Sequence, residues 1–151
     1  MTVQPTSNLL KLQLIPVFES SYIRIELEAA LKFIRVLWLR HPSSDEFREG
    51  FSKAADLTIA HHCHYWLSDS RAIHYLQLAD QNWLIRLVTQ LLPQVKLRRF
   101  ARLNTLESLA MMDVPRTLNE LEKLPDWQQH TLTKVFTEED DALAWLFNAY
   151  N

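Results

Sequence analysis

The chain has 151 residues, of which 48% are hydrophobic and 23% charged, with a formal net charge of -2 and a pI near 6.3. These values fit one globular domain over 1–151, and they give no overall field that would attract nucleic acid or an anionic membrane. The single glycine excludes glycine-rich phosphate loops, and the single cysteine excludes an intrachain disulfide. No run approaches the roughly 20 apolar residues of a membrane span, and the start lacks the pattern of a signal peptide, so we expect a cytoplasmic protein without membrane insertion.

Alternating polar and apolar residues predict strands at 10–14 and 23–27. The first is an extra N-terminal strand within 1–19, and we expect Pro16 to end it. The second forms an antiparallel hairpin with the β-branched and aromatic run 32–39.

A capping box of Ser43 and Glu46 then predicts a helix that continues to about Ala60. Gly50 lies inside this helical pattern, where glycine costs roughly 1 kcal/mol relative to alanine. We therefore interpret Gly50 as a position of close packing.

The nearly all-apolar run 63–67 predicts a strand in the middle of a sheet, and Asp80 predicts the cap of a helix that ends at Pro93. The remaining chain predicts, in order, a strand, two short helices, a strand and a final helix at 97–103, 105–111, 113–121, 131–136 and 137–150. This alternation predicts an α/β (α+β) fold: a single domain with a mixed sheet of about five to six strands and helices packed mainly on one side.

Polar residues follow the central predicted strand at its carboxyl end, where open α/β sheets form the crevice that meets ligands. The candidate ligand-binding or partner-binding residues are Ser68, Asp69, Ser70, Arg71 and Asp80. Arg71 can present two parallel donors to a carboxylate or phosphate. The structural alternative is that Arg71 pairs with Asp69 or Asp80 while the other side chains bond to the turn.

Three histidines surround the cysteine at 61–64, a composition that suits zinc. Adjacent side chains of a strand point to opposite faces, so only His62 and His64 converge easily, and two ligands do not complete a structural site. We therefore predict no metal site and no cofactor, and we interpret Cys63 as a small core residue rather than a nucleophile.

Basic residues surround Phe100, a pattern that can bind single-stranded nucleic acid: Lys96, Arg98, Arg99 and Arg102. We favour the alternative that these charges protect an edge strand from aggregation, and we predict no nucleic-acid partner. Five tryptophans are numerous for this length. We interpret Trp66, Trp83 and Trp145 as core and leave open whether Trp38 and Trp127 line an apolar pocket.

Five segments, taken together in this order, resemble the uncharacterised bacterial branch of the STAS domain, or SpoIIAA-like, family. They are Trp38, the run 44–48, the run 66–71, the run 80–84, and Phe136 with 142–146. The resemblance implies a mixed sheet with helices mainly on one side and no enzyme activity. Relatives in this family include anti-sigma factor antagonists, in which a serine of an Asp-Ser-Ser-Gly motif is phosphorylated. Ser70 follows Asp69 in a similar setting, so the resemblance implies a phosphorylation site at Ser70, although Arg71 follows in place of a small residue.

Our first functional hypothesis is a non-enzymatic regulatory or protein-interaction module with an unidentified protein partner. The second is a domain that binds a small hydrophobic or lipid-like ligand. The third is an acid/base enzyme that uses Asp69, Arg71 and His74 in one cleft. A homodimer is compatible with each of the three.

Overall fold

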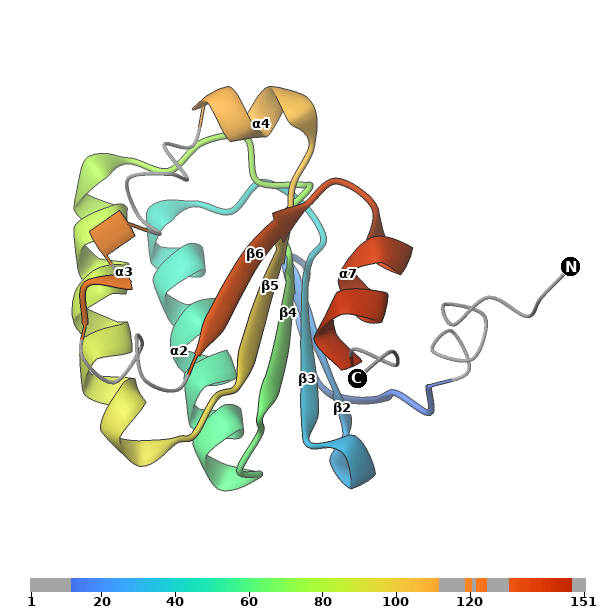
Figure 1. The fold of residues 1–151 in the computed structure, drawn as a ribbon. Helices are drawn as coiled ribbons and strands as arrows, with labels where there is room; N and C mark the ends of the chain where they lie inside the picture. The colour runs from blue at the N-terminus through green and yellow to red at the C-terminus, as the bar shows by residue number, and fades with distance from the viewer. Residues whose placement is uncertain (1–11, 112–118, 121, 125–130, 148–151) are drawn as a thin grey trace, which may run out of the picture.

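The protein forms one six-stranded sheet in a computed structural model that describes residues 12–111, 119–120, 122–124 and 131–147 (Figure 1). The strands are β1 (Ile15–Glu19), β2 (Ile23–Glu28), β3 (Phe33–Trp38), β4 (Tyr65–Asp69), β5 (Arg99–Leu103) and β6 (Leu132–Phe136). The main helices are α2 (Ser44–Ala60), α3 (Leu78–Leu91), α4 (Leu106–Met111) and α7 (Glu139–Phe147), with 3-10 turns at Ala29–Leu31 and Leu92–Gln94. The predicted mixed sheet of an α/β fold is confirmed.

The order of the strands in the sheet follows their order in the chain. β1, β2 and β3 pair antiparallel, whereas β3, β4, β5 and β6 pair parallel. When parallel strands are added in one direction along a sheet, right-handed connections place their helices on the same face. Accordingly, α2 and α3 cover one face together. α7 covers the other face over β4, β5 and β6 (Figure 1).

Both faces of the central strand β4 are buried. The Trp66 ring lies toward α2 and α3, with its centroid 5.3 Å from that of Phe51 and 5.6 Å from that of Phe100. Leu67 points the other way and belongs to the cluster that contains Ala142 and Leu143 of α7. Burial on both faces explains why the strand appears in the sequence as a continuous apolar run rather than an alternating one.

Helix α2 begins as the sequence predicts. The Ser43 hydroxyl accepts a hydrogen bond from the backbone N–H of Glu46 at 3.2 Å, and the Glu46 carboxylate accepts one from the backbone N–H of Ser43 at 2.9 Å. The packing role of Gly50 is also confirmed. A Cβ atom at this position would lie 2.8 Å from Cη2 of Trp38 and 2.9 Å from Cδ1 of Ile23.

The prediction for the N-terminal strand is wrong in position. Residues 12–14 are not in a strand, residues 10 and 11 lie outside the described part of the chain, and β1 contains Pro16 instead of ending before it. Proline lacks the N–H of a ladder bond but is tolerated on an edge strand, and β1 is an edge strand with an irregularity between Pro16 and Phe18.

Two other boundaries and one strand position also differ from prediction. Ser68 and Asp69 are the last residues of β4 rather than the turn after it, and α3 begins at Leu78, which places Asp80 in its first turn. β5 lies between β4 and β6, so the basic residues around Phe100 do not protect an edge.

Most of the predicted helix 113–121, together with Trp127 and Tyr150, lies outside the described residues. No helix in the described part of the chain has the length and apolar character to cross a bilayer.

Candidate functional site

The five predicted site residues fall into three separate groups. Side chains alternate along β4, so Ser68 lies on the same face as Trp66, toward α2 and α3, while Asp69 lies on the face of Leu67 and α7. Ser70 contacts Ser68, Arg71 pairs with Asp69, and Asp80 lies between α2 and α3. The carboxyl end of β4 therefore supplies polar groups to both faces of the sheet.

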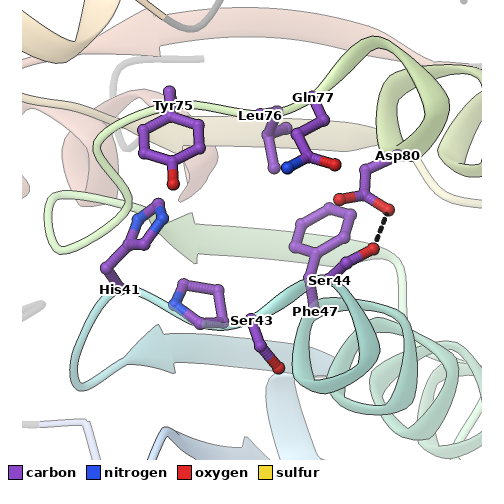
Figure 2. A pocket seen from close by; sticks show the side chains of 9 residues that line it. His41, Ser43, Ser44, Phe47, Tyr75, Leu76, Gln77 and Asp80 are labelled. Carbon is purple, nitrogen blue, oxygen red and sulfur yellow. Dashed lines mark hydrogen bonds between the residues drawn. The ribbon is translucent and has the colours of Figure 1, made fainter.

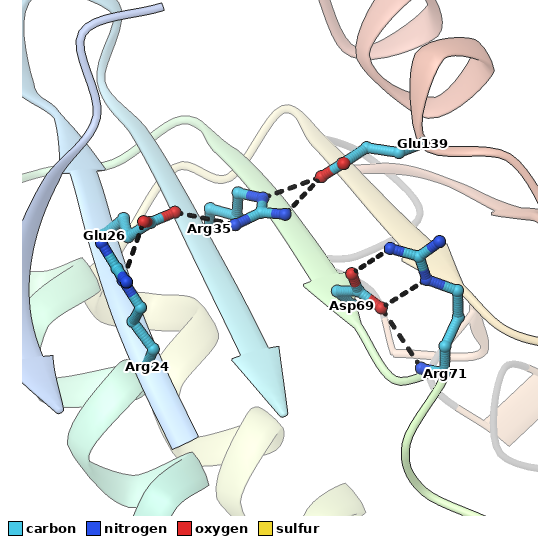
Figure 3. A network of polar contacts seen from close by, with 6 residues as sticks. All are labelled: Arg24, Glu26, Arg35, Asp69, Arg71 and Glu139. Atoms are coloured by element: carbon cyan, nitrogen blue, oxygen red, sulfur yellow. Dashed lines mark hydrogen bonds and ion pairs between the residues drawn. The ribbon is translucent and has the colours of Figure 1, made fainter. Parts of the chain in front are cut away.

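Asp69 and Arg71 form a two-pronged ion pair (Figure 3). The Arg71 guanidinium donates from Nε and Nη2 to the two carboxylate oxygens at 3.0 and 2.7 Å, and the backbone N–H of Arg71 donates to Oδ1 at 3.3 Å. The hydrogen bonds to Asp69 raise the pKa of Arg71. The structural alternative for Arg71 is confirmed, with Asp69 as its partner.

A second network of charges lies on the same face (Figure 3). The Arg35 guanidinium donates from Nη1 to Glu26 at 2.8 Å and from Nε to Glu139 of α7 at 2.8 Å. Burial acts to lower the pKa of Arg35, but the two carboxylates outweigh burial and the net pKa is raised. Glu26 also pairs with Arg24 at 3.0 Å. This network ties α7 to the antiparallel part of the sheet.

Ser68 and Ser70 form a hydroxyl pair beneath the turn that follows β4. Their oxygens are 3.1 Å apart, and both side chains are buried. The backbone of Ser70 is also engaged, because its N–H donates to the carbonyl of Leu103 at 2.8 Å and its carbonyl accepts from Ile73 at 3.0 Å. Because Ser70 is only 1% exposed, modification of its hydroxyl requires this turn to open.

Asp80 joins the starts of α2 and α3. Its Oδ1 accepts hydrogen bonds from the Ser44 hydroxyl at 2.6 Å and from Nε of Arg48 at 2.9 Å. The Arg48 guanidinium also lies over the ring of Trp83, 5.6 Å from its centroid. This carboxylate holds the two helices in register at the carboxyl edge of the parallel strands.

A pocket of about 350 Å³ opens at this edge, between the starts of α2 and α3 (Figure 2). Figure 2 shows the rings of His41 and Tyr75 at one end of the pocket and the Asp80 carboxylate at the other. The lining residues come from the segment after β3 and the segment after β4: His41, Pro42, Ser43, Ser44, Phe47, Tyr75, Leu76, Gln77 and Asp80.

His41 connects the two segments that line the pocket. Its Nδ1 accepts a hydrogen bond from the backbone N–H of His74 at 3.1 Å, and its ring centroid lies 5.3 Å from the ring of His74 and 4.4 Å from the ring of Tyr75. An acceptor at Nδ1 requires the proton of the neutral ring to be on Nε2. Burial, followed by the nearby charge of His74, lowers the pKa of His41, so at neutral pH the ring is a neutral Nε2–H donor.

The imidazole of His41 is expected to titrate below its ordinary pKa of 6.5, and His74→Gln is expected to raise that pKa without restoring it fully, because burial remains. The unfolded chain binds the proton first, so His41 contributes stability above pH 6.5 that is lost as the pH falls toward its folded-state pKa. NMR titration of the ring resonances measures both values. If the pKa of His41 in His74→Gln were equal to or lower than its pKa in the wild type, the pairing of these two rings would be contradicted.

Sequence reasoning missed His41, Tyr75 and Gln77. A signal was present, since the segments after two neighbouring parallel strands meet at one edge, but only the segment after β4 was considered. The residues of the enzyme hypothesis make separate contacts, because His74 bonds to His41 whereas Asp69 bonds to Arg71. Within the described ranges, no three His, Cys, Asp or Glu side chains are grouped to hold a metal ion.

Comparison with known proteins gives no match to a family model, a curated protein or a solved structure.

Proposed function

We propose that this protein is a non-enzymatic regulatory module that binds a small polar ligand in the pocket between the starts of α2 and α3. The observation that carries the proposal is the pocket itself, whose volume of about 350 Å³ lies within the range of small-molecule sites. Its place at the carboxyl ends of parallel strands is the usual ligand position in open α/β sheets. The resemblance to STAS domains supports a regulatory role.

The pocket favours a neutral or cationic ligand. The starts of α2 and α3 already carry the carboxylates of Glu46 and Asp80, which offset the partial positive charge of the helix ends. Among the described residues, Oδ2 of Asp80 accepts no hydrogen bond, whereas Oδ1 accepts two. A ligand with a donor group can therefore bind Oδ2 while its acceptor meets Nε2–H of His41.

The proposal contains no catalytic step, because the titratable side chains of the pocket already bond to other groups of the protein. Asp80 is held by Ser44 and Arg48, and Nδ1 of His41 is held by the backbone of His74. Both side chains thus position the pocket walls. The polar lining favours a polar ligand over the lipid-like ligand considered from the sequence.

Binding of a protein partner at the same edge is the second candidate function. Four of the eight large apolar side chains that are exposed in the described residues follow the carboxyl ends of β3, β4 and β5: Leu39, Tyr75, Leu78 and Leu106. Exposed apolar side chains at a ligand-binding edge suit a surface that a partner covers. Phosphorylation of Ser70 as a switch for such a partner stays a prediction.

Gln77→Leu is expected to weaken ligand binding by about tenfold, because it replaces a polar wall of the pocket without emptying it. Ligand-observed NMR against a library of neutral and cationic polar metabolites identifies binders of the wild-type chain, and titration compares the variants. Gln90→Leu makes the same change at an exposed position near the end of α3 and serves as the matched control.

The pocket proposal would be contradicted if Gln77→Leu and Gln90→Leu changed the affinity for the ligands equally, or if no compound of the library bound. A partner protein that is captured by the wild-type chain and lost in Leu78→Asp would instead favour the second candidate.

A further inference from the structure

Arg102 is a buried arginine in the interior of the sheet. It lies on β5 directly opposite Ser68 of β4 and Val135 of β6. Its neighbour in alternation, Phe100, packs in the core beneath α2 and α3, whereas Ala101 and Leu103 pack against α7. The Arg102 side chain therefore lies on the face of α2 and α3, beside Ser68, and the residue is only 6% exposed.

The Nε atom of the Arg102 guanidinium is buried and lacks a partner, whereas its two Nη atoms are not among the fully buried unpartnered atoms of the described residues. Nε of Arg102 has no hydrogen-bond acceptor, and no described carboxylate lies within ion-pair distance of this side chain. Burial alone lowers the pKa of Arg102 to about 10, so the group still carries its charge at neutral pH. An isolated buried charge is strongly unfavourable, and proteins normally pair it.

Other arginines of the chain show how the fold treats such a charge elsewhere. Arg35, whose side chain is 15% exposed, is bound by the carboxylates of Glu26 and Glu139. Arg71 is bound by Asp69. Arg102 is more deeply buried, and no described side chain supplies it with an equivalent anion. A bound anion would balance its charge.

The neighbouring hydroxyl groups fit an anion as well. Ser68 and Ser70 share one hydrogen bond, with their oxygens 3.1 Å apart, and only one of their two hydroxyl protons is used in it. The second proton is available to another acceptor. Arg102 and Ser68 are paired on neighbouring strands, and a guanidinium combined with a hydroxyl donor suits the oxygens of a phosphate or carboxylate.

We propose that Arg102, together with the Ser68–Ser70 hydroxyl pair, binds an oxyanion that belongs to a phosphate-bearing or carboxylate-bearing ligand, which reaches these buried groups when the turn after β4 opens. None of these three residues lines the pocket between α2 and α3, so the proposal concerns a second site. The two sites also differ in charge preference, because the pocket contains the Asp80 carboxylate and the second site contains an unpaired cation.

Thermal unfolding and isothermal titration with sodium phosphate and sodium acetate, compared with sodium chloride at equal ionic strength, test this site. Phosphate or acetate is expected to raise the melting temperature of the wild-type protein beyond the effect of chloride. Response to phosphate alone indicates a phosphate group, and response to acetate alone indicates a carboxylate. Arg102→Met is expected to weaken the binding by at least about tenfold. Without added anion, its melting temperature should equal or exceed that of the wild type.

Arg98→Met is the matched control, because it removes the same charge from an exposed position beside the start of β5. It should keep the anion response. Ser68→Ala retains the guanidinium and should weaken binding several-fold, which keeps the test decisive if Arg102→Met does not fold. No response of the wild type to either oxyanion, or equal responses of Arg102→Met and Arg98→Met, would overturn the proposal. So would an unchanged affinity in Ser68→Ala.

Discussion

Gly50→Leu is expected to lower the free energy of unfolding by about 3 kcal/mol, despite the higher helix propensity of leucine. A Cβ atom at this position already lies within 2.8 Å of the Trp38 ring and 2.9 Å of Ile23. Trp38 has little freedom to move, because its ring stacks on Tyr22 and Phe47 with centroids 6.4 and 5.5 Å away. Chemical denaturation followed by tryptophan fluorescence measures the loss.

Gly50→Ala separates steric overlap from helix propensity. It should lower the free energy of unfolding by only about 1 kcal/mol, since the gain in helix propensity offsets part of the cost of the overlap. Trp38→Phe removes the ring atoms that meet the added Cβ. In that background, Gly50→Ala should cost less than in the wild type, although the contact with Ile23 remains, and the difference defines the coupling between the two positions. Ala60→Leu, at the exposed end of α2, is the control for added apolar volume. A Gly50→Leu protein as stable as the wild type would disprove the close contact.

Arg35→Met is expected to cost about 3 kcal/mol of stability, since it leaves two carboxylates without their shared cation. Glu26 and Glu139 both bond to the Arg35 guanidinium, and the Glu26 side chain is only 9% exposed. The change should also loosen α7, because Glu139 is its first residue. Hydrogen exchange of the α7 amides, together with the unfolding free energy, measures both effects.

Arg24→Met is the matched control for Arg35→Met. Arg24 pairs with Glu26 alone, and its side chain is 37% exposed. Its replacement should therefore change stability by no more than about 1 kcal/mol. Combining Arg35→Met with Glu26→Gln and Glu139→Gln should recover most of the loss, because both carboxylates that shared Arg35 are then neutral. The charge of Arg24, which loses Glu26, is 37% exposed and remains solvated. Equal losses for Arg35→Met and Arg24→Met would mean that burial does not strengthen this network.

The sequence predicts most of the fold because its patterns are local. The capping box at Ser43, the apolar run of β4 and the alternation of β2 each depend on neighbouring residues, and all three elements are present. Pro16 misled the prediction of β1, because whether proline ends a strand depends on whether that strand lies at an edge. The order of strands in the sheet decides this, and single-strand patterns do not contain it.

The candidate site was harder to predict because it depends on which strands are neighbours. Ser68 and Asp69 are adjacent in the chain but lie on opposite faces of the sheet, so the predicted group divides. Asp80 binds Ser44 from a different helix. The interpretation of Arg102 as an edge residue failed for the same reason, since β6 was not placed beside β5. Contacts between elements, rather than propensities, determine these positions.

The agreement between strand order and chain order has a consequence for biosynthesis. A chain that leaves the ribosome from its N-terminus can close the β2–β3 hairpin first and then add β4, β5 and β6 in turn to an edge that already exists. Each strand after β1 finds a neighbour that has already been made. The face of the sheet on which α7 packs, however, stays uncovered until α7 emerges after β6.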